Sequence, residues 1–393
     1  MSTAATSTTP GTPGGARARR SPGERWAHLP RPVKVLVWLL VALLFYALPL
    51  LNPPLLATSE SDFGSVMFTV ASYALVALGL NIVLGYAGLL DLGYVGFYAI
   101  GAYTVGVFGS LHGQLPFWLL IVLAVCISTA SGLLLGAPTL RVRGDYLAIV
   151  TLGFGEIIRL VALNSEWLNQ SRGIQDIPRP PDIAVGGEPL FEVPRLVWDG
   201  LTATIDLGTT SAFLQFGLLD GVPYYWLALT VIILILVGDV LLQDSRVGRA
   251  WEATREDEEA AELNGVPTFR YKLLAFAMGA FIGGLSGALF AARQGAINPE
   301  TFTVQLSMLF LAAVVVGGQG NRWGVLVGAA VVAYLPERFR DFAEFRVVVF
   351  GLLLLLLANF RPQGLLPPRR ARRAQRAGRR LAELEGTEEG ARG

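Results

Sequence analysis

The side chains that most often perform chemistry in proteins are scarce in this sequence. It contains two histidines, His28 and His112, and a single cysteine, Cys126, which lies within an apolar run. Metal-binding and catalytic sites need several such groups close together, and these three residues are far apart along the chain. The phosphate-binding motif GxxxxGK[ST] is also missing from the sequence. We therefore expect no catalytic residues, no metal site and no cofactor, and any energy from ATP must come through a partner.

Ionisable side chains within apolar stretches are stronger candidates. Asp91 lies in a glycine-rich stretch with Gly93 and Gly96, and Glu156 and Arg159 lie within a later apolar run. Charged groups at membrane depth often mark substrate paths, and helices broken by glycine occur beside such paths. These five residues are therefore a candidate translocation path. The alternatives are that the glycines only allow close helix packing, and that Glu156 and Arg159, three residues apart, neutralise each other.

A further candidate is the polar segment Arg246–Pro267, which separates two apolar runs. Its Ala, Glu and Arg residues favour a short helix. Gly265 followed by Pro267 is a signal for the end of that helix. Because apolar runs flank it, membrane helices must present this segment to water, either as a simple connector or as a contact site.

The elements that would position these residues are membrane helices. Hydrophobic residues make up 53% of the 393 residues and charged residues only 16%, whereas ordinary soluble domains carry about 25% charged residues. Several apolar runs reach the length that crosses a bilayer, so we predict an all-α polytopic membrane protein with about ten transmembrane helices, some of them short or broken. Gly279, Gly283 and Gly287 recur at every fourth position of one run, which predicts a stripe for close helix packing.

Composition divides the chain into three parts. Residues 1–32 form a basic arm with the composition of a disordered segment, 33–360 form the membrane domain and 361–393 form an Arg-rich tail. Two long polar loops interrupt the membrane domain: the acidic loop 164–222 and the loop 243–272, which holds the polar segment. Lys and Arg concentrate in both ends of the chain and in 243–272. The positive-inside rule therefore places these regions in the cytoplasm and 164–222 on the outer side.

Several stretches of the chain resemble one family of transporters. Glu259, Ala260 and Ala261, followed after three residues by Gly265, match the EAA---G core of the cytoplasmic loop in ATP-binding cassette (ABC) importer permeases. Further stretches resemble, in order, the LivM-type permease subunit of branched-chain amino acid ABC importers. They are residues 80–103, 143–160, 249–266, 289–302, 314–329 and 361–367. The N-terminal arm, the long 164–222 loop and the basic tail depart from the family pattern.

The resemblance implies a transporter built from several subunits. A second, related permease subunit forms a heterodimer with this chain, two ATP-binding subunits dock on the cytoplasmic side, and an extracytoplasmic binding protein delivers substrate. The EAA loop is then a coupling helix that fits a groove in an ATP-binding subunit. Its expected contact residues are Arg255, Glu256, Asp257, Glu259, Ala260, Ala261 and Gly265. The protein would lie in the plasma (inner) membrane with both termini cytoplasmic and would bind no nucleic acid. Its basic tail would either contact anionic lipid headgroups or only enforce topology.

The predicted function is therefore permease for Leu, Ile and Val, with ATP hydrolysed by separate subunits. Related permeases carry urea, short amides or other amino acids, and an apolar membrane interior does not distinguish among these substrates. A secondary transporter driven by an ion gradient is a further alternative, with Asp91 and Glu156 as its carboxylates, but the EAA core disfavours it. A membrane-embedded enzyme would lack catalytic machinery.

Overall fold

The computed structural model describes residues 30–53, 62–141, 144–182 and 220–338, together with shorter pieces of the chain. These pieces are 184–185, 188–189, 192–199, 202–212, 215–217, 348, 351–352, 355, 359–360 and 364–366. The predicted N-terminal arm and most of the basic tail lie outside the described residues. By its contacts the chain forms two compact units, Met1–Leu48 and Pro49–Gly393.

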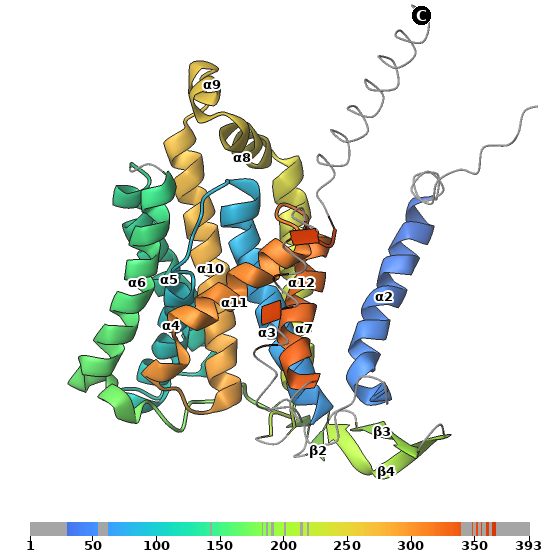
Figure 1. Cartoon of the computed structure of the whole chain (residues 1–393). Coiled ribbons are helices and arrows are strands. Elements are labelled where there is room, and N and C mark those ends of the chain that lie inside the picture. The colour runs from blue at the N-terminus through green and yellow to red at the C-terminus, as the bar shows by residue number, and fades with distance from the viewer. Residues whose placement is uncertain are drawn as a thin grey trace, which may run out of the picture. The chain divides into compact units, whose positions relative to one another are not determined.

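The first unit is described mainly through α2 (Arg31–Leu51), the blue helix in Figure 1. Its apolar stretch, Pro32–Leu51, has a mean hydropathy of 2.3. Val35, Leu39 and Leu43 are 58%, 62% and 65% exposed. Apolar side chains that are exposed along a helix of this length are suited to lipid rather than to water.

The second unit is a bundle of helices. Its first half contains α3 (Phe63–Leu80), the π-helix η1 (Asn81–Tyr86), α4 (Val95–Gly106), the π-helix η2 (Val107–Leu111), α5 (Phe117–Thr139) and α6 (Gly144–Asn164). Its second half contains α7 (Val222–Asp244), α8 (Arg246–Glu256), α9 (Glu258–Leu263), α10 (Thr268–Gln294), the 3-10 turn η5 (Pro299–Thr301), α11 (Val304–Gly317) and α12 (Arg322–Arg338).

Helix α10 forms the centre of this bundle and packs against α3, α4 and α5. The predicted glycine stripe lies on these contacts. A Cβ at Gly279 would lie 2.5 Å from Val83, one at Gly283 would lie 3.1 Å from Phe97 Cβ, and one at Gly287 would overlap the carbonyl oxygen of Tyr98. The stripe therefore brings α10 close to η1 and α4, as expected of small residues at a helix contact.

Buried hydrogen bonds reinforce the close approach of these helices. Tyr94 donates from its hydroxyl to the carbonyl oxygen of Gly279 at 2.7 Å, and Ser128 on α5 donates to the carbonyl oxygen of Ala280 at 2.8 Å. Hydroxyl donors between helices satisfy polar groups that lipid could not satisfy. The centre of the bundle is thus held by backbone proximity as well as by apolar packing.

Seven helices in the described part of the chain are long and apolar enough to cross a membrane. They are Pro32–Leu51, Phe63–Tyr86, Phe117–Thr139, Tyr146–Asn164, Val222–Asp244, Thr268–Gln294 and Pro299–Gly317. Two further apolar segments, Val95–Leu111 and α12, are helical but shorter. Another apolar run, near 347–359, falls mostly outside the described residues. The helical membrane fold is confirmed, including the expected short helices.

The long polar loop between α6 and α7 contains local structure of its own. It holds the 3-10 turns η3 (Glu166–Leu168) and η4 (Gln170–Arg172) and the strands β1 (Ala184–Val185), β2 (Glu188–Pro189), β3 (Glu192–Asp199) and β4 (Thr202–Ala212). β1 pairs with β2 and β3 pairs with β4, both antiparallel. An antiparallel bridge between Ile174 and Ile297, with N–H···O distances of 2.8 and 2.9 Å, ties the loop to the connection after α10.

Candidate functional site

The predicted coupling segment forms a corner of two short helices. Figure 1 shows α8 and α9 at the top of the bundle, where α7 ends and α10 begins. The expectation of one helix was wrong, because Asp257 takes an extended conformation (φ −156°, ψ 110°) between the two helices. Its carboxylate accepts a hydrogen bond from Ala260 N at 3.0 Å and so caps the start of α9. An Asp side chain that bonds to the backbone in this way favours a new helix start over continuation of the old one.

Both outer ends of this corner are fixed by helix caps. Ser245 caps α8 by accepting from Val247 N at 3.1 Å and Gly248 N at 3.4 Å. At the end of α9, Gly265 adopts φ +81° and its N–H bonds to Glu262 O at 2.8 Å, while Val266 N bonds to Ala261 O at 3.0 Å. This pair of bonds is a Schellman motif, which needs a left-handed residue after the helix. The predicted helix end at Gly265 is confirmed.

Three side-chain contacts attach the corner to the first turns of α10. Trp251, which is 1% exposed, donates from Nε1 to the carbonyl oxygen of Tyr271 at 2.6 Å. Glu258 forms an ion pair with Lys272, and Thr268 donates to Glu262. Because both α8 and α9 are bonded to α10, the corner is built to move together with the membrane helix rather than independently.

The structure divides the predicted contact residues by location. Arg255, Glu256, Asp257, Glu259, Ala260 and Gly265 are exposed, whereas Ala261 is only 5% exposed and packs inward. The polar segment also presents Leu263, which is 90% exposed and which sequence reasoning missed. An apolar residue within a polar segment, near its helix-ending glycine, is the signal that could have identified it. The Leu263 side chain is therefore available to a partner, beside exposed acidic residues.

Arg255 is directed at the membrane domain. Its Nη1 donates to the carbonyl oxygen of Gly85 in η1. Partial removal of water from the guanidinium lowers the pKa of Arg255, but an arginine titrates so far above neutral pH that the side chain remains charged. Arg255, which the sequence predicts as a contact for an ATP-binding subunit, thus lies next to α9 but forms its hydrogen bond with Gly85 of this chain.

The Asp91 segment lies where the chain is not helical, between η1 and α4. Asp91 is 1% exposed; its Oδ1 accepts from Gly93 N at 2.9 Å, and its Oδ2 has no hydrogen-bond partner among the described residues. Leu92 N donates to Thr151 Oγ1 on α6 at 3.0 Å. The break in the helix is therefore buried around Asp91 and is held against α6 by this hydrogen bond.

The two glycines of this segment allow that approach. A Cβ at Gly93 would overlap the carbonyl oxygen of Thr151, and one at Gly96 would lie 2.8 Å from Phe154 Cε1. Gly155 on α6 lies opposite Gly93, and a Cβ at Gly155 would lie 3.3 Å from Gly93 Cα. These contacts favour the packing interpretation of Gly93 and Gly96.

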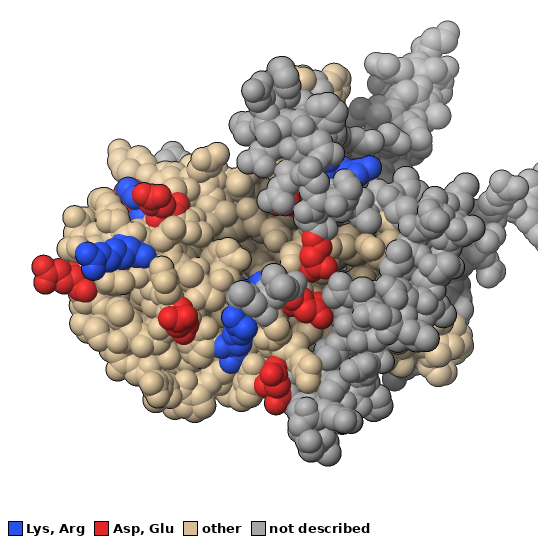
Figure 2. Space-filling model, turned by 90° about the horizontal axis from the view of Figure 1, so that it is seen from below, with Lys and Arg blue, Asp and Glu red and all other residues tan. Residues whose placement is uncertain are grey.

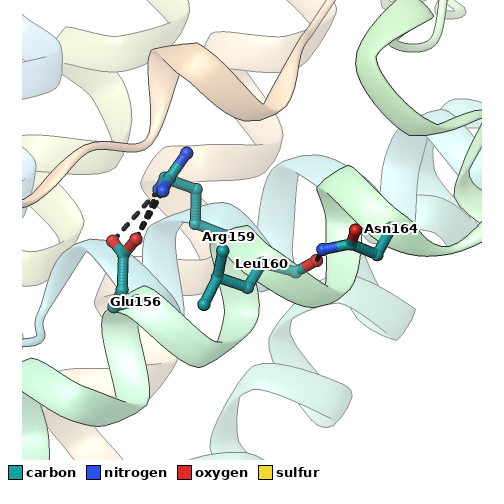
Figure 3. Close-up of polar contacts among 4 residues, drawn as sticks. All are labelled: Glu156, Arg159, Leu160 and Asn164. Atoms are coloured by element: carbon teal, nitrogen blue, oxygen red, sulfur yellow. Dashed lines mark hydrogen bonds and ion pairs between the residues drawn. The ribbon is translucent and has the colours of Figure 1, made fainter.

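Glu156 and Arg159 form the pair that their spacing predicts. Arg159 Nε lies 3.0 Å from both carboxylate oxygens of Glu156, and Nη2 contacts Oε1 as well (Figure 3). The side chains are 33% and 22% exposed, respectively. Asn164, one turn further along α6, instead bonds to the carbonyl oxygen of Leu160 at 2.8 Å. The two charges are mutually neutralised, which is the arrangement expected of a structural pair on an apolar helix.

The face of the molecule opposite to α8 and α9 has a different character. Figure 2 shows this face, where Lys, Arg, Asp and Glu side chains of the described residues are scattered among uncharged residues. Charges of both signs are interspersed there and do not gather into a patch of one sign.

Comparisons with known proteins agree with the geometry. The family model described as "Branched-chain amino acid transport system / permease component" matches residues 63–358. The permease protein LivM of a high-affinity branched-chain amino acid transport system in Salmonella typhimurium is 43% identical over 315 residues, which cover 79% of this chain and 71% of that protein. LivM of Escherichia coli is 44% identical over 299 residues, covering 75% of this chain and 68% of that protein.

A second permease type is also similar to this chain. LivH of Salmonella typhimurium is 26% identical over 312 residues, covering 75% of this chain and 91% of that protein. No solved structure matches the chain. The family match spans the helical bundle, including α8 and α9, and the LivM identity is well above the level at which family membership is secure. The chain therefore belongs to the multi-pass permease components of branched-chain amino acid transport systems, as the EAA core and the ordered sequence stretches predict.

Proposed function

We propose that this chain is one of two related permease subunits in an ATP-driven importer of leucine, isoleucine and valine. Its similarity to proteins named LivM supports the substrate class, and its weaker similarity to LivH supports a heterodimer of two homologous subunits. An extracytoplasmic binding protein would deliver the amino acid to the permease pair. This chain would provide part of the passage, and ATP would be hydrolysed by partner subunits.

The corner formed by α8 and α9 is the observation that carries the ATP-driven part of this proposal. It is fixed by caps at both ends and bonded to α10 through Trp251 and Glu258, so a push on it is transmitted to a central membrane helix. Exposed Glu259, Ala260 and Leu263 form its outer surface. A rigid corner with this surface suits docking on an ATP-binding subunit whose closure rotates the membrane helices.

The orientation follows from the same assignment. If α8 and α9 face the cytoplasm, the bundle's opposite end and the loop 164–222 face outward and meet the binding protein. The distribution of Lys and Arg supports a cytoplasmic location for both termini. The basic tail, most of which lies outside the described residues, would then meet the inner leaflet of the plasma membrane.

Uptake by the reconstituted complex tests this function. The chain is co-purified with its paired permease and ATP-binding subunits and placed in vesicles with the binding protein present outside. We expect ATP-dependent accumulation of labelled leucine, isoleucine and valine. Labelled urea and short amides serve as competing substrates, and accumulation of these in place of the amino acids would overturn the substrate assignment.

Energy coupling is tested in the same vesicles. Vanadate traps ABC ATPases, so it is expected to abolish uptake, whereas collapse of the proton and sodium gradients is expected to leave uptake unchanged. Uptake that survives vanadate but stops when an ion gradient is removed would identify a secondary transporter. It would also assign Asp91 or Glu156 as an ion-coupling carboxylate.

A further inference from the structure

The side chain of Arg255 lies in a cradle of glycines that belong to the membrane domain. Its Nη1 donates to Gly85 O, and a Cβ at Gly88 would lie 2.8 Å from Arg255 Cγ. A Cβ at Gly320 would lie 3.1 Å from Arg255 Nη1. Gly88 and Gly320 have φ of +73° and +80°. Two separate turns of the chain therefore have glycine, which lacks a side chain, at the positions next to the Arg255 side chain.

The segments that receive Arg255 are themselves bonded to one another. Gly320 N donates to Asn81 Oδ1 at 2.8 Å, so the turn between α11 and α12 is joined to the start of η1. Asn81 is 1% exposed. A Cβ at Gly85 would lie 2.6 Å from Gly320 N, which shows how closely the two segments approach. Arg255 therefore touches a junction between α3–η1 and α11–α12.

The same junction reaches α7 through a group of polar side chains. Tyr86, the last residue of η1, donates from its hydroxyl to Asp239 Oδ2 at 3.1 Å. Arg322, the first residue of α12, lies with Nη1 3.3 Å from Asp239 Oδ2 and also donates to Gln243. η1 is consequently connected to α7 and α12 and, through Arg255, to α8.

The chain leads directly from this junction to the buried break at Asp91. After η1 it passes Gly88 and reaches Asp91 and Gly93, which pack against α6. A π-helix has wider turns and poorer hydrogen bonds than an α-helix and often occurs at functional sites. Such an element can rearrange at lower free-energy cost than the regular helices on either side of it.

We propose that Arg255 is a positioning residue that transmits movement of α8 to η1 and the turn containing Gly320, rather than a contact for the ATP-binding subunit. This inference rests on the proposed ATP-driven function. The planar guanidinium forms a directional hydrogen bond with the Gly85 carbonyl oxygen, and the close approach of Gly88 and Gly320 restricts movement of the Arg255 side chain. Movement of α8 with α10 therefore pulls on η1 and, beyond it, on the Asp91 segment.

The variant Arg255→Gln tests this link, with Arg249→Gln as its matched control. Arg249 lies on the same helix, but its guanidinium donates to Asp244 O at the α7–α8 corner instead of to η1. In vesicles containing the full complex, substrate uptake and ATP hydrolysis are measured together. We expect Arg255→Gln to retain its ATP-binding subunits and to lower uptake per ATP hydrolysed by about tenfold, a typical size for a coupling interaction. Arg249→Gln is expected to keep the wild-type ratio.

An independent measurement reports on the junction itself. Hydrogen exchange of the backbone amides in 82–90 is expected to be faster in Arg255→Gln than in wild type or Arg249→Gln, because η1 has lost its anchor. If Arg255→Gln does not yield folded permease, Arg255→Lys replaces it, since lysine keeps the charge but not the guanidinium fork.

Two results would overturn the proposal. The first is an unchanged uptake per ATP in the Arg255 variant. The second is loss of the ATP-binding subunits from the purified variant, which would make Arg255 a docking residue after all. Failure of the proposed function itself would be seen separately, as absence of vanadate-sensitive uptake by the wild-type complex.

Discussion

Trp251 of α8 donates its indole N–H to the carbonyl oxygen of Tyr271, in the first turn of α10, at 2.6 Å. The indole is almost completely buried, so this bond joins the coupling corner to the central membrane helix. Trp251→Phe removes the donor and is expected to lower the free energy of unfolding by about 1 kcal/mol. Trp251→Ala also leaves a cavity and is expected to lower it by about 3–5 kcal/mol. Thermal unfolding of the purified protein in detergent measures both.

The matched control for Trp251 is Trp118→Phe, because Trp118 is 53% exposed. It should leave the unfolding temperature unchanged. Equal effects of the phenylalanine variants at the two positions would show that the Trp251–Tyr271 bond does not stabilise the corner.

Gly265 is required for its backbone conformation and not for lack of space. Its φ is +81°, yet no atom lies within 4 Å of a Cβ built there. A β-branched residue in the left-handed conformation costs roughly 1–2 kcal/mol or more, so Gly265→Val is expected to distort the end of α9. We expect lower substrate-stimulated ATP hydrolysis with normal expression, and near-normal hydrolysis for Gly265→Asn, since asparagine tolerates this conformation.

Gly238→Val on α7 is the control for this substitution. Gly238 is also in open space, but it lies within a regular helix and is not among the residues with positive φ. Unchanged coupling in Gly265→Val vesicles would show that the Schellman motif is dispensable.

Leu263 is expected to be an apolar anchor for the ATP-binding subunit. Its 90% exposure at the tip of α9 leaves the side chain available to a pocket on a partner. Leu263→Asp introduces a charge into that pocket and is expected to weaken docking at least about tenfold, as found when central interface residues are replaced. Co-purification and titration of the ATP-binding subunits measure the effect. A docking affinity unaffected by Leu263→Asp would place the contact elsewhere.

Gly93 and Gly153 provide a matched pair for testing the packing of the broken segment. A Cβ at Gly93 would overlap the backbone of Thr151, whereas no atom lies within 4 Å of one at Gly153 on α6. Gly93→Ala is expected to destabilise the protein by about 1–3 kcal/mol, and Gly153→Ala to stabilise it by up to about 1 kcal/mol. Thermal unfolding distinguishes them. A neutral Gly93→Ala would mean that the segment can shift away from α6.

The Glu156–Arg159 pair is expected to be structural. Either single reversal, Glu156→Arg or Arg159→Glu, puts two like charges three residues apart on an apolar helix and should lower the yield of folded protein. The double reversal restores opposite charges and should recover both yield and uptake. Asn164→Ala, which removes only a local bond to Leu160, is the control. If the double variant folds but does not transport, the individual charges contribute to the substrate path.

The class of protein, and the segment that we propose as its coupling site, could be predicted from the sequence alone. Apolar runs long enough to cross a bilayer predict membrane helices because lipid offers no hydrogen-bond partners to the backbone. The spacing from Glu259 to Gly265 matches the EAA---G core, from which we propose the coupling loop, and the three-residue spacing of Glu156 and Arg159 predicts their ion pair. The glycine stripe on α10 was likewise readable, since every fourth residue of a helix lies on nearly the same face.

Only the tertiary structure decided which way each side chain of that segment faces. Asp257 ends one helix and starts another by a local hydrogen bond whose strength relative to helix continuation cannot be read from helix propensity. Arg255 is exposed as a whole, but its guanidinium is directed at Gly85 because Gly85, Gly88 and Gly320, distant from it in sequence, leave room there. Trp251 and Glu258 bond α8 and α9 to α10 and so fix how these two short helices are oriented. Leu263 at the end of α9 is exposed to solvent as a result. These orientations depend on contacts between residues far apart in the chain, and local spacing carries no information about them.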